Sequence, residues 1–276
     1  MIRILLLFII FQFSNVYSQT FTTERRYPTN KFSSQIKGVS DLIVLYDVTI
    51  SDGKNKKSTA QTLLQSGERF SKFIDINTIK RDSLLQEHSN LETVGAKELN
   101  DLSKYNVIYK KNLLKDFQSE TVYVQERISK NVYQYQESIP KLDWKLTNDK
   151  MILLGYKCKS AKLSFRGRNY VAWYTDEIPK SDGPYIFSGL PGLILKISDT
   201  EGIYEFTAVG IEKKKMDIYF RNEKTIHHIS RDDFRKIQRN YFENPSLFML
   251  SKAYDETGKE ISPRSVIRHY SPLELE

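Results

Sequence analysis

The chain has 276 residues, of which 39% are hydrophobic and 12% aromatic, and it carries a formal net charge of +8. Its one cysteine, Cys158, excludes an intramolecular disulfide, so stability must come from burial, which is feasible because a chain of this length buries roughly 70% of its unfolded surface. The excess of basic over acidic residues favours anionic partners. The charge is spread along the chain. We expect an anionic glycan, a lipid headgroup or an envelope protein as the partner, and we do not expect nucleic acid.

The N-terminus has the pattern of a secretory signal peptide. Arg3 supplies a positive charge, and residues 4–13 form an apolar run that is too short to span a bilayer. Val16 and Ser18 then occupy positions −3 and −1 of a cleavage site. The pattern predicts a signal peptide over residues 1–18 and export to the periplasm or the extracellular space, with an N-terminal strand or anchor helix as the alternative. Because no cysteine stands near the junction, a lipoprotein anchor is not expected.

The rest of the chain is expected to form one domain. Residues 19–31 are polar and predict a mobile arm, whereas residues 32–276 show no repeat and no long linker rich in proline, glycine or serine. No later apolar stretch is long enough to cross a membrane as a helix, so no transmembrane segment is expected in the mature chain.

Alternation of apolar and polar residues predicts strands through the first half of the domain. Polarity rises and the alternation fades between residues 77 and 105, which predicts a helical or irregular insertion there. The expected strands are 41–50, 59–65, 69–74, 107–110, 121–128 and 132–137.

The second half continues with strands joined by short turns. A strand at 142–146 is followed by an expected turn at 147–150 and by one long strand over 151–165. A tight turn at 166–169 then leads to further strands, expected at 170–175, 193–198 and 204–211. This succession predicts a mainly β (α+β) fold, in which an antiparallel meander forms a curved sheet, a bowl or an open barrel.

One amphipathic helix is predicted near the C-terminus. Ser230 and Asp233 have the spacing of a capping box, and Asn244–Pro245 is expected to end the helix. The apolar residues of one helical face are Phe234, Ile237 and Tyr241. We expect the helix to cover one face or one opening of the sheet.

The hexapeptide at 189–194 has the chemistry of a turn that leads into a strand. Pro191 presets φ at the second position and Gly192 accepts a positive φ at the third, which predicts a type II turn followed by a strand buried on both faces. A structural role is therefore expected for its residues, which are Gly189, Leu190, Pro191, Gly192, Leu193 and Ile194.

The sequence around the hexapeptide resembles the GLPGLI family. Four stretches carry the resemblance, GYKCKSA at 155–161, FRGR at 165–168, VAWYT at 171–175 and GPYIFSGLPGLI at 183–194. The family consists of exported envelope proteins of Gram-negative bacteria with no established activity. A related module resembles the bowl-shaped N-terminal accessory domain of a type of peptide-N-glycosidase. The resemblance therefore implies a β-rich bowl with a binding or positioning role, and it names no ligand.

The sequence contains no strong catalytic or metal-binding motif. His227 and His228 would point to opposite faces of a strand, and the usual spacings of metal ligands are absent, so neither a metal nor a cofactor is expected. Cys158 would form a dyad with a histidine only if the fold brought them together. Whether the protein is an enzyme stays open. We expect that it is not, and a hydrolase that uses Cys158 or an acidic residue such as those of Asp176–Glu177 is the alternative.

The candidate ligand-binding residues lie beside the hexapeptide. Arg166 and Arg168 precede Trp173 and Tyr174 across a tight turn, and aromatic faces beside guanidinium groups suit sugar rings or anionic headgroups. Alternatively, Trp173 belongs to the core and the arginines are charges of the turn. We therefore expect an exported, non-enzymatic envelope protein that binds a glycan, a lipid or a partner protein. Docking of its basic surface to outer-membrane machinery is a third interpretation.

Overall fold

The computed structural model describes residues 24–29, 31–54, 56–244, 248, 253–254, 260–261 and 272–275. The predicted signal peptide at 1–18 lies outside these residues, as does the first part of the predicted arm. Within the rest of the arm, β1 (Tyr27–Pro28) pairs with β5 (Thr93–Val94). The side chain of Arg26 also donates hydrogen bonds to Thr93. The mobility of the arm and the one-domain organisation stay predictions.

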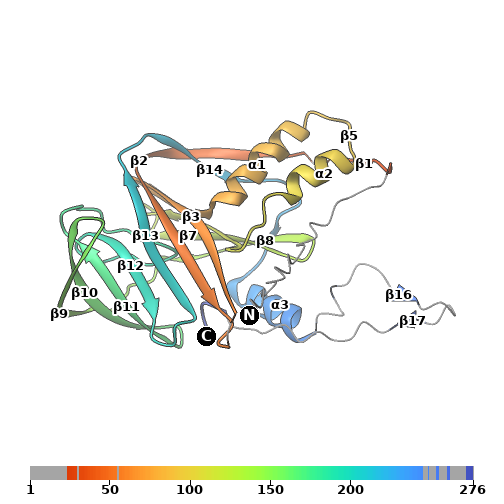
Figure 1. Ribbon diagram of the computed structural model, residues 1–276. Helices are drawn as coiled ribbons and strands as arrows, with labels where there is room; N and C mark the ends of the chain where they lie inside the picture. Colours follow the sequence, from red (N-terminus) through yellow and green to blue (C-terminus); the bar gives the residue numbers. More distant parts are fainter. Residues whose placement is uncertain are drawn as a thin grey trace, which may run out of the picture.

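A 13-stranded curved sheet forms most of the protein, with α1 and α2 on one side and α3 near one end (Figure 1). Two short strands, β16 (Ala253–Tyr254) and β17 (Glu260–Ile261), pair separately from it. The strands of the large sheet are β2 (Ser34–Ser51), β3 (Lys57–Gly67), β4 (Phe70–Asp75), β6 (Lys111–Asp116), β7 (Thr121–Ile128), β8 (Asn131–Ser138), β9 (Lys145–Leu153), β10 (Tyr156–Phe165), β11 (Arg168–Thr175), β12 (Leu193–Asp199), β13 (Tyr204–Glu212), β14 (Met216–Arg221) and β15 (His227–His228).

The order of the strands makes the sheet an open meander. The hydrogen-bonded path is β15-β8-β7-β6-β4-β3-β2-β13-β12-β11-β10-β9, and β14 pairs with β2 beside this path. Neighbouring strands are antiparallel, except that β15 runs parallel to β8. Across the part of the chain that the structure describes, the two ends of the path do not pair, so the sheet is not a closed barrel. The predicted mainly β fold with a curved antiparallel sheet is confirmed.

The strand predicted at 107–110 is wrong, because β6 begins only at Lys111. The backbone N–H groups of Ile108 and Tyr109 donate to Oδ2 of Asp75, at 3.2 and 3.0 Å. These groups therefore bond to a side chain at the start of α1 and are not available to a neighbouring strand. An apolar run cannot reveal such a side-chain acceptor, which lies more than 30 residues earlier in the chain.

The predicted long strand at 151–165 is also wrong, because a turn divides it into β9 and β10. Leu154 and Gly155 form the turn with φ of 51° and 84°, and Leu153 pairs with Tyr156 across it. The turn predicted at 147–150 lies inside β9 instead. Because β9 is an edge strand, its polar side chains reach solvent, and polar residues that resemble a turn are tolerated there.

The predicted helical insertion is confirmed as α1 (Ile76–His88) and α2 (Ala96–Ser103). Asp75 caps α1 by accepting a hydrogen bond from the backbone N–H of Asn77 at 2.8 Å. A helix N-terminus leaves N–H groups without partners, so this carboxylate fixes where α1 begins. The helix packs on β3 and β4.

The predicted C-terminal helix is confirmed as α3 (Arg231–Glu243). The hydroxyl of Ser230 accepts from the backbone N–H of Asp233 at 3.0 Å, as a helix cap does. Phe234 is buried against the rings of Tyr133 and Tyr135 on β8. The helix therefore covers the end of the sheet at β8, as Figure 1 shows.

The hexapeptide forms a turn that leads into the buried strand β12, but the predicted type II turn is wrong. The backbone N–H of Gly192 donates to the carbonyl of Leu190 at 2.8 Å, which makes a three-residue turn around Pro191. A type II turn would use the N–H of Leu193, and this group donates instead to the carbonyl of Ile178 at 3.1 Å. The N–H of Leu193 therefore bonds to the loop at Ile178 and is not available to close a type II turn.

Gly192 is the residue on which the hexapeptide turn depends most. Its φ is 147°, and a Cβ atom at this position would lie 2.0 Å from the carbonyl oxygen of Thr175. Gly202 also has a positive φ, 68°, but a Cβ there would meet nothing within 4 Å. A comparison of the two glycines therefore separates the cost of a positive φ from the cost of a clash with neighbouring backbone.

We predict that Gly192→Ala lowers the free energy of unfolding by about 3 kcal/mol or more, because backbone must move to relieve the clash. Gly202→Ala, which adds only the strain of a positive φ, is expected to cost about 1–2 kcal/mol. Urea unfolding followed by tryptophan fluorescence measures both. Equal losses for the two variants would show that the close approach at Gly192 is not important.

Lys72 on β4 is fully buried beneath α1. Its Nζ lies 3.4 Å from the centroid of the Tyr219 ring and accepts or donates no hydrogen bond within the described parts of the chain. Desolvation lowers the pKa of this amine from its ordinary value of 10.5 to about 7, although the charge of Asp82 opposes the shift. The charged form is therefore costly in the folded protein.

We predict that Lys72→Met raises the free energy of unfolding at pH 6, by on the order of 4 kcal/mol. At that pH the wild-type amine is protonated in both states and carries its full burial cost in the folded state. Between about pH 7 and 10.5 the folded protein is already deprotonated and the unfolded chain is not, so wild-type stability rises and the gain shrinks. Urea unfolding at pH 6 and pH 9 tests this, and a gain that is independent of pH would contradict it.

Candidate anion-binding pocket

Arg166 and Arg168, two of the four residues predicted to bind a ligand, are already bonded to carboxylates. The guanidinium of Arg166 pairs with Glu137 and Glu274. That of Arg168 is 4% exposed and lies 2.8 Å from Asp199. Both arginines flank the turn between β10 and β11, as the sequence suggested, and these partners come from distant parts of the chain.

The structure does not gather all four predicted residues into one site. Arg168 and Tyr174 stand six residues apart on β11, which is about 20 Å along a strand. Tyr174 is buried and Trp173 is half-buried. The structure therefore brings only the two arginines together, and ligand binding by the four residues stays a prediction.

The carboxylate that occupies Arg166 belongs to the C-terminal segment, residues 272–275. Glu274 is buried, and its carboxylate accepts hydrogen bonds from Arg166, from Arg231 and from the hydroxyl of Tyr185. Burial alone would raise the pKa of Glu274, but the nearby arginine charges and these hydrogen bonds hold it below its ordinary value. The segment is therefore held against α3 and the β10–β11 turn by a charged anchor.

Cys158 does not meet the histidines considered with it for catalysis, although it lines a hollow of about 490 Å³ together with Asp176 and Glu177. Cys158 is buried on β10, and this burial, with the charge of Glu177, raises the pKa of its thiol. His227 and His228 are on β15, at the opposite end of the hydrogen-bonded path, so neither forms a dyad with Cys158. Among the described residues, no three histidine, cysteine or acidic side chains are grouped to hold a metal ion. No helix in the same ranges is long and apolar enough to cross a membrane.

A hollow of about 350 Å³ with several charged residues in its lining lies between α1, the segment after α2, the sheet and the end of α3. We call it the arginine pocket. Figure 1 shows the elements that surround it, α1 and α2 on one side and β7, β8 and α3 on the other. Its charged lining residues are Arg81 and Asp82 of α1, Lys110, Glu126 and Arg127 near and in β7, and Arg221 of β14.

One of the three arginines of the pocket is neutralised by neighbouring carboxylates. The guanidinium of Arg221 lies 2.7 Å from Glu223 and 3.4 Å from Asp82. The remaining acidic residue, Glu126, is bonded to Lys111 at 2.6 Å. The acidic residues of the pocket are therefore already paired.

The other three cations have no such partner. Within the described ranges, Arg81, Lys110 and Arg127 form no ion pair with a carboxylate. Arg81 donates to the carbonyl of Leu102 at 2.7 Å, and Arg127 donates to that of Lys130 at 3.1 Å. These bonds to carbonyl groups hold the side chains in place without cancelling their charge.

The arginines also act on each other electrostatically. The surrounding protein, and then the charges of Arg221 and Arg81, hold the pKa of Arg127 below its ordinary value. Burial and the charge of Arg221 likewise lower the pKa of Arg81, against the opposing effect of Asp82. Like charges therefore lie close enough to repel each other, and an anion in the pocket would relieve this repulsion.

A neutral polar group adds hydrogen-bonding capacity to the same pocket. Asn112 is buried in β6 and donates from Nδ2 to Gln125 at 3.3 Å. Its Oδ1 accepts no hydrogen bond from any described residue. Leaving a buried acceptor without a partner costs about 1–3 kcal/mol, so a small displacement toward a ligand hydroxyl or a water would be favourable.

Sequence reasoning did not identify the arginine pocket. Its cations come from α1, from the loop before β6, from β7 and from β14, and no local motif links them. Only the fold brings them together. The surplus of basic residues over acidic ones was the one available signal, and it does not assign a position.

Comparison with known proteins supports the fold and leaves the activity open. Residues 97–196 match the model of a family described as a protein of unknown function, Porph_ging. The structure of PNGF-II in the P21 space group is similar at a TM-score of 0.50 and 16% sequence identity, over 71% of this chain and 33% of that chain. For the C2 form of PNGF-II the values are 0.49, 15%, 71% and 32%.

No curated protein matches the chain. The chain spans about a third of the length of PNGF-II. At this identity the similarity is one of fold alone. The chain therefore shares its fold with part of PNGF-II, and its central region is similar to a family whose function is unknown.

Proposed function

We propose that the protein is a non-catalytic binding module whose arginine pocket takes an anionic glycan. The observation that carries the proposal is the group of three cations, Arg81, Lys110 and Arg127, around one hollow without a carboxylate partner in the described part of the chain. Binding an anion there replaces repulsion between like charges with charge-assisted hydrogen bonds.

The kind of side chain favours a planar acid group. A guanidinium offers parallel N–H donors that match both oxygens of a carboxylate, and the same arrangement suits sulfate or phosphate. Lys110 adds a mobile point charge at the rim. Asn112 and the fixed carboxylate of Glu126 add acceptors for hydroxyl groups. This combination of cations with hydroxyl acceptors matches an acidic sugar.

The similarity to part of PNGF-II is compatible with a role as an accessory module, which recognises or positions a ligand for another unit. The hydrolase alternative has less support. Cys158 lies away from the histidines, and the raised pKa of its thiol makes the nucleophilic thiolate scarce. We also propose that the protein works in the cell envelope or outside the cell, after export by residues 1–18.

We predict that the protein binds carboxylated or sulfated oligosaccharides on a glycan array and does not bind neutral ones of the same length. Arg127→Gln is expected to weaken this binding about tenfold or more, because a charge-assisted hydrogen bond contributes about 1.5–3 kcal/mol. Lys162→Gln, which removes one exposed charge from β10, serves as the matched control and should change little. Equal binding of neutral glycans, or of the Arg127 variant, would contradict the proposal.

We predict that the full chain, produced in a Gram-negative host, is exported and begins at Gln19 after processing. N-terminal sequencing of the periplasmic and secreted fractions measures this. A variant that lacks residues 2–18 should stay in the cytoplasm. Recovery of the uncleaved chain in the cytoplasm would show that these residues are not a signal peptide.

A further inference from the structure

A second hollow, of about 260 Å³, lies directly beside the arginine pocket. We call it the aromatic pocket. The two hollows share two lining residues, Lys110 and Glu126. The aromatic rings that line the second hollow belong to Tyr109, Tyr204 and Phe242.

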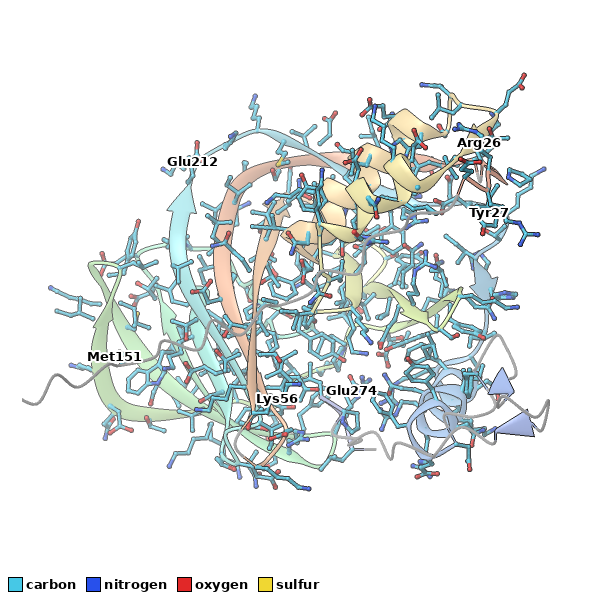
Figure 2. The ribbon with its side chains drawn as sticks, turned by 45° about the vertical axis from the view of Figure 1, so that its right-hand side comes forward. Arg26, Tyr27, Lys56, Met151, Glu212 and Glu274 are labelled. Atoms are coloured by element: carbon cyan, nitrogen blue, oxygen red, sulfur yellow. The ribbon has the colours of Figure 1, made fainter. Side chains whose placement is uncertain are left out.

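The C-terminal segment forms one wall of the aromatic pocket, and the turn between β2 and β3 forms another. Pro272 and Leu273 line it on one side, and Lys56 and Ser58 line it on the other. Figure 2 shows Lys56 and Glu274 on the same side of the molecule, well apart from Met151 on the β9–β10 hairpin. The pocket is therefore formed from parts of the chain that are far apart in sequence.

The volumes indicate that the arginine pocket is barely large enough for a ligand by itself and that the aromatic pocket is too small. Sites for small molecules usually have volumes of about 300–1,000 Å³. At about 350 Å³ the arginine pocket is at the lower end of this range, and at about 260 Å³ the aromatic pocket is below it. Because the same two side chains border both, one ligand that passes over Lys110 would fill both.

We propose that the two hollows form one groove that binds an extended acidic oligosaccharide, with successive sugar units in the arginine pocket and the aromatic pocket. This inference rests on the proposed function and adds the length of the ligand and the position of its charges. It assigns binding roles to Lys56, Lys110 and Phe242 in addition to those of the arginines.

The aromatic pocket has the groups that recognise sugar rings. Phe242 is half-buried near the end of α3, where its ring contacts that of Tyr241 edge to face, and it lines the hollow. Sugar rings stack their C–H faces on such rings, while polar neighbours bind the hydroxyl groups. Ser58 provides such a polar neighbour, whereas the amide of Gln238 is bonded to Glu126 and Arg235.

Positive charge continues along the groove. Lys56 and Lys110 are exposed, and neither forms an ion pair within the described ranges. Lys111 is the exception, because it is bonded to Glu126 at 2.6 Å. Of the two acidic residues in the aromatic pocket, Glu126 is bonded to Lys111, and Asp52 accepts from the backbone N–H groups of Lys54 and Lys56. Lys56 and Lys110 therefore match a ligand that carries an acid group on more than one sugar unit, as an oligouronate does.

Glu126 is positioned to bind at the junction of the two hollows. Its carboxylate accepts from Lys111 and, at 3.3 and 3.4 Å, from Nε2 of Gln238. These contacts fix its orientation on β7. A carboxylate has lone pairs for further bonds, so Glu126 would accept from a ligand hydroxyl between two acid groups.

The test is calorimetric titration of the full exported chain with galacturonic acid monomer and tetramer, and with the methyl ester of the tetramer. The tetramer is expected to bind at least tenfold more tightly than the monomer, and the ester, which lacks the charges, much more weakly than the acid. Arg127→Gln should weaken binding of both the monomer and the tetramer. Phe242→Ala should weaken only the tetramer and leave the monomer unchanged.

A second variant covers the case in which Phe242→Ala does not fold. Lys56→Gln changes an exposed side chain at the β2–β3 turn, and it too should weaken only the tetramer. Lys162→Gln, on β10 near the other end of the strand order, should weaken neither ligand.

The two proposals fail in different ways. Equal affinity for monomer and tetramer, or no effect of Phe242→Ala and Lys56→Gln on the tetramer, would overturn the extended groove. The anion pocket would still stand in that case, provided that Arg127→Gln weakens binding of the monomer. Absence of acid-dependent binding at either length would overturn both.

Discussion

The long strand β2 is the element on which the rest of the structure depends. One edge of β2 pairs with β3 over most of its length. The other edge is divided, because residues 34–40 pair with β14 and residues 43–50 pair with β13. This division separates β14 from the path of the sheet and carries Arg221 to Asp82 on α1. Without it, the arginine pocket would lose one wall.

The distribution of paired and unpaired charges distinguishes structural residues from candidate binding residues. The buried pairs Arg168–Asp199 and Lys115–Asp182 are matched, because leaving one buried charge alone would cost several kcal/mol. Lys72 is the buried exception, and desolvation lowers its pKa to about 7. Arg81, Lys110 and Arg127 differ, since they face a hollow and not the core. The lowered pKa values of Arg81 and Arg127 in a concave site are typical of function, whereas stability alone would favour a carboxylate beside them.

The sequence predicted features that depend on local pattern and missed those that depend on distant contacts. Strand β7 was predicted with its observed bounds, since its alternation and flanking turns are local. The turn at Leu154–Gly155 was missed because a leucine with positive φ has no sequence signal. For Arg166, the sequence indicated a charge beside a turn but not its partner Glu274, which lies 108 residues later. The arginine pocket could not be predicted at all for the same reason.

The arginines beside the hexapeptide still have a connection to the groove, although an indirect one. Arg168 donates to the carbonyl of Pro272, Tyr170 donates to that of Leu273, and Arg166 pairs with Glu274. Pro272 and Leu273 line the aromatic pocket, so the charges of the β10–β11 turn hold its wall in place. Strand β12 pairs with β11, and its hexapeptide residues lie opposite Tyr174 and Thr175, at the end of β11 away from this turn. The arginines that the sequence indicated as ligand-binding residues therefore hold the C-terminal wall of the aromatic pocket in place and do not line it.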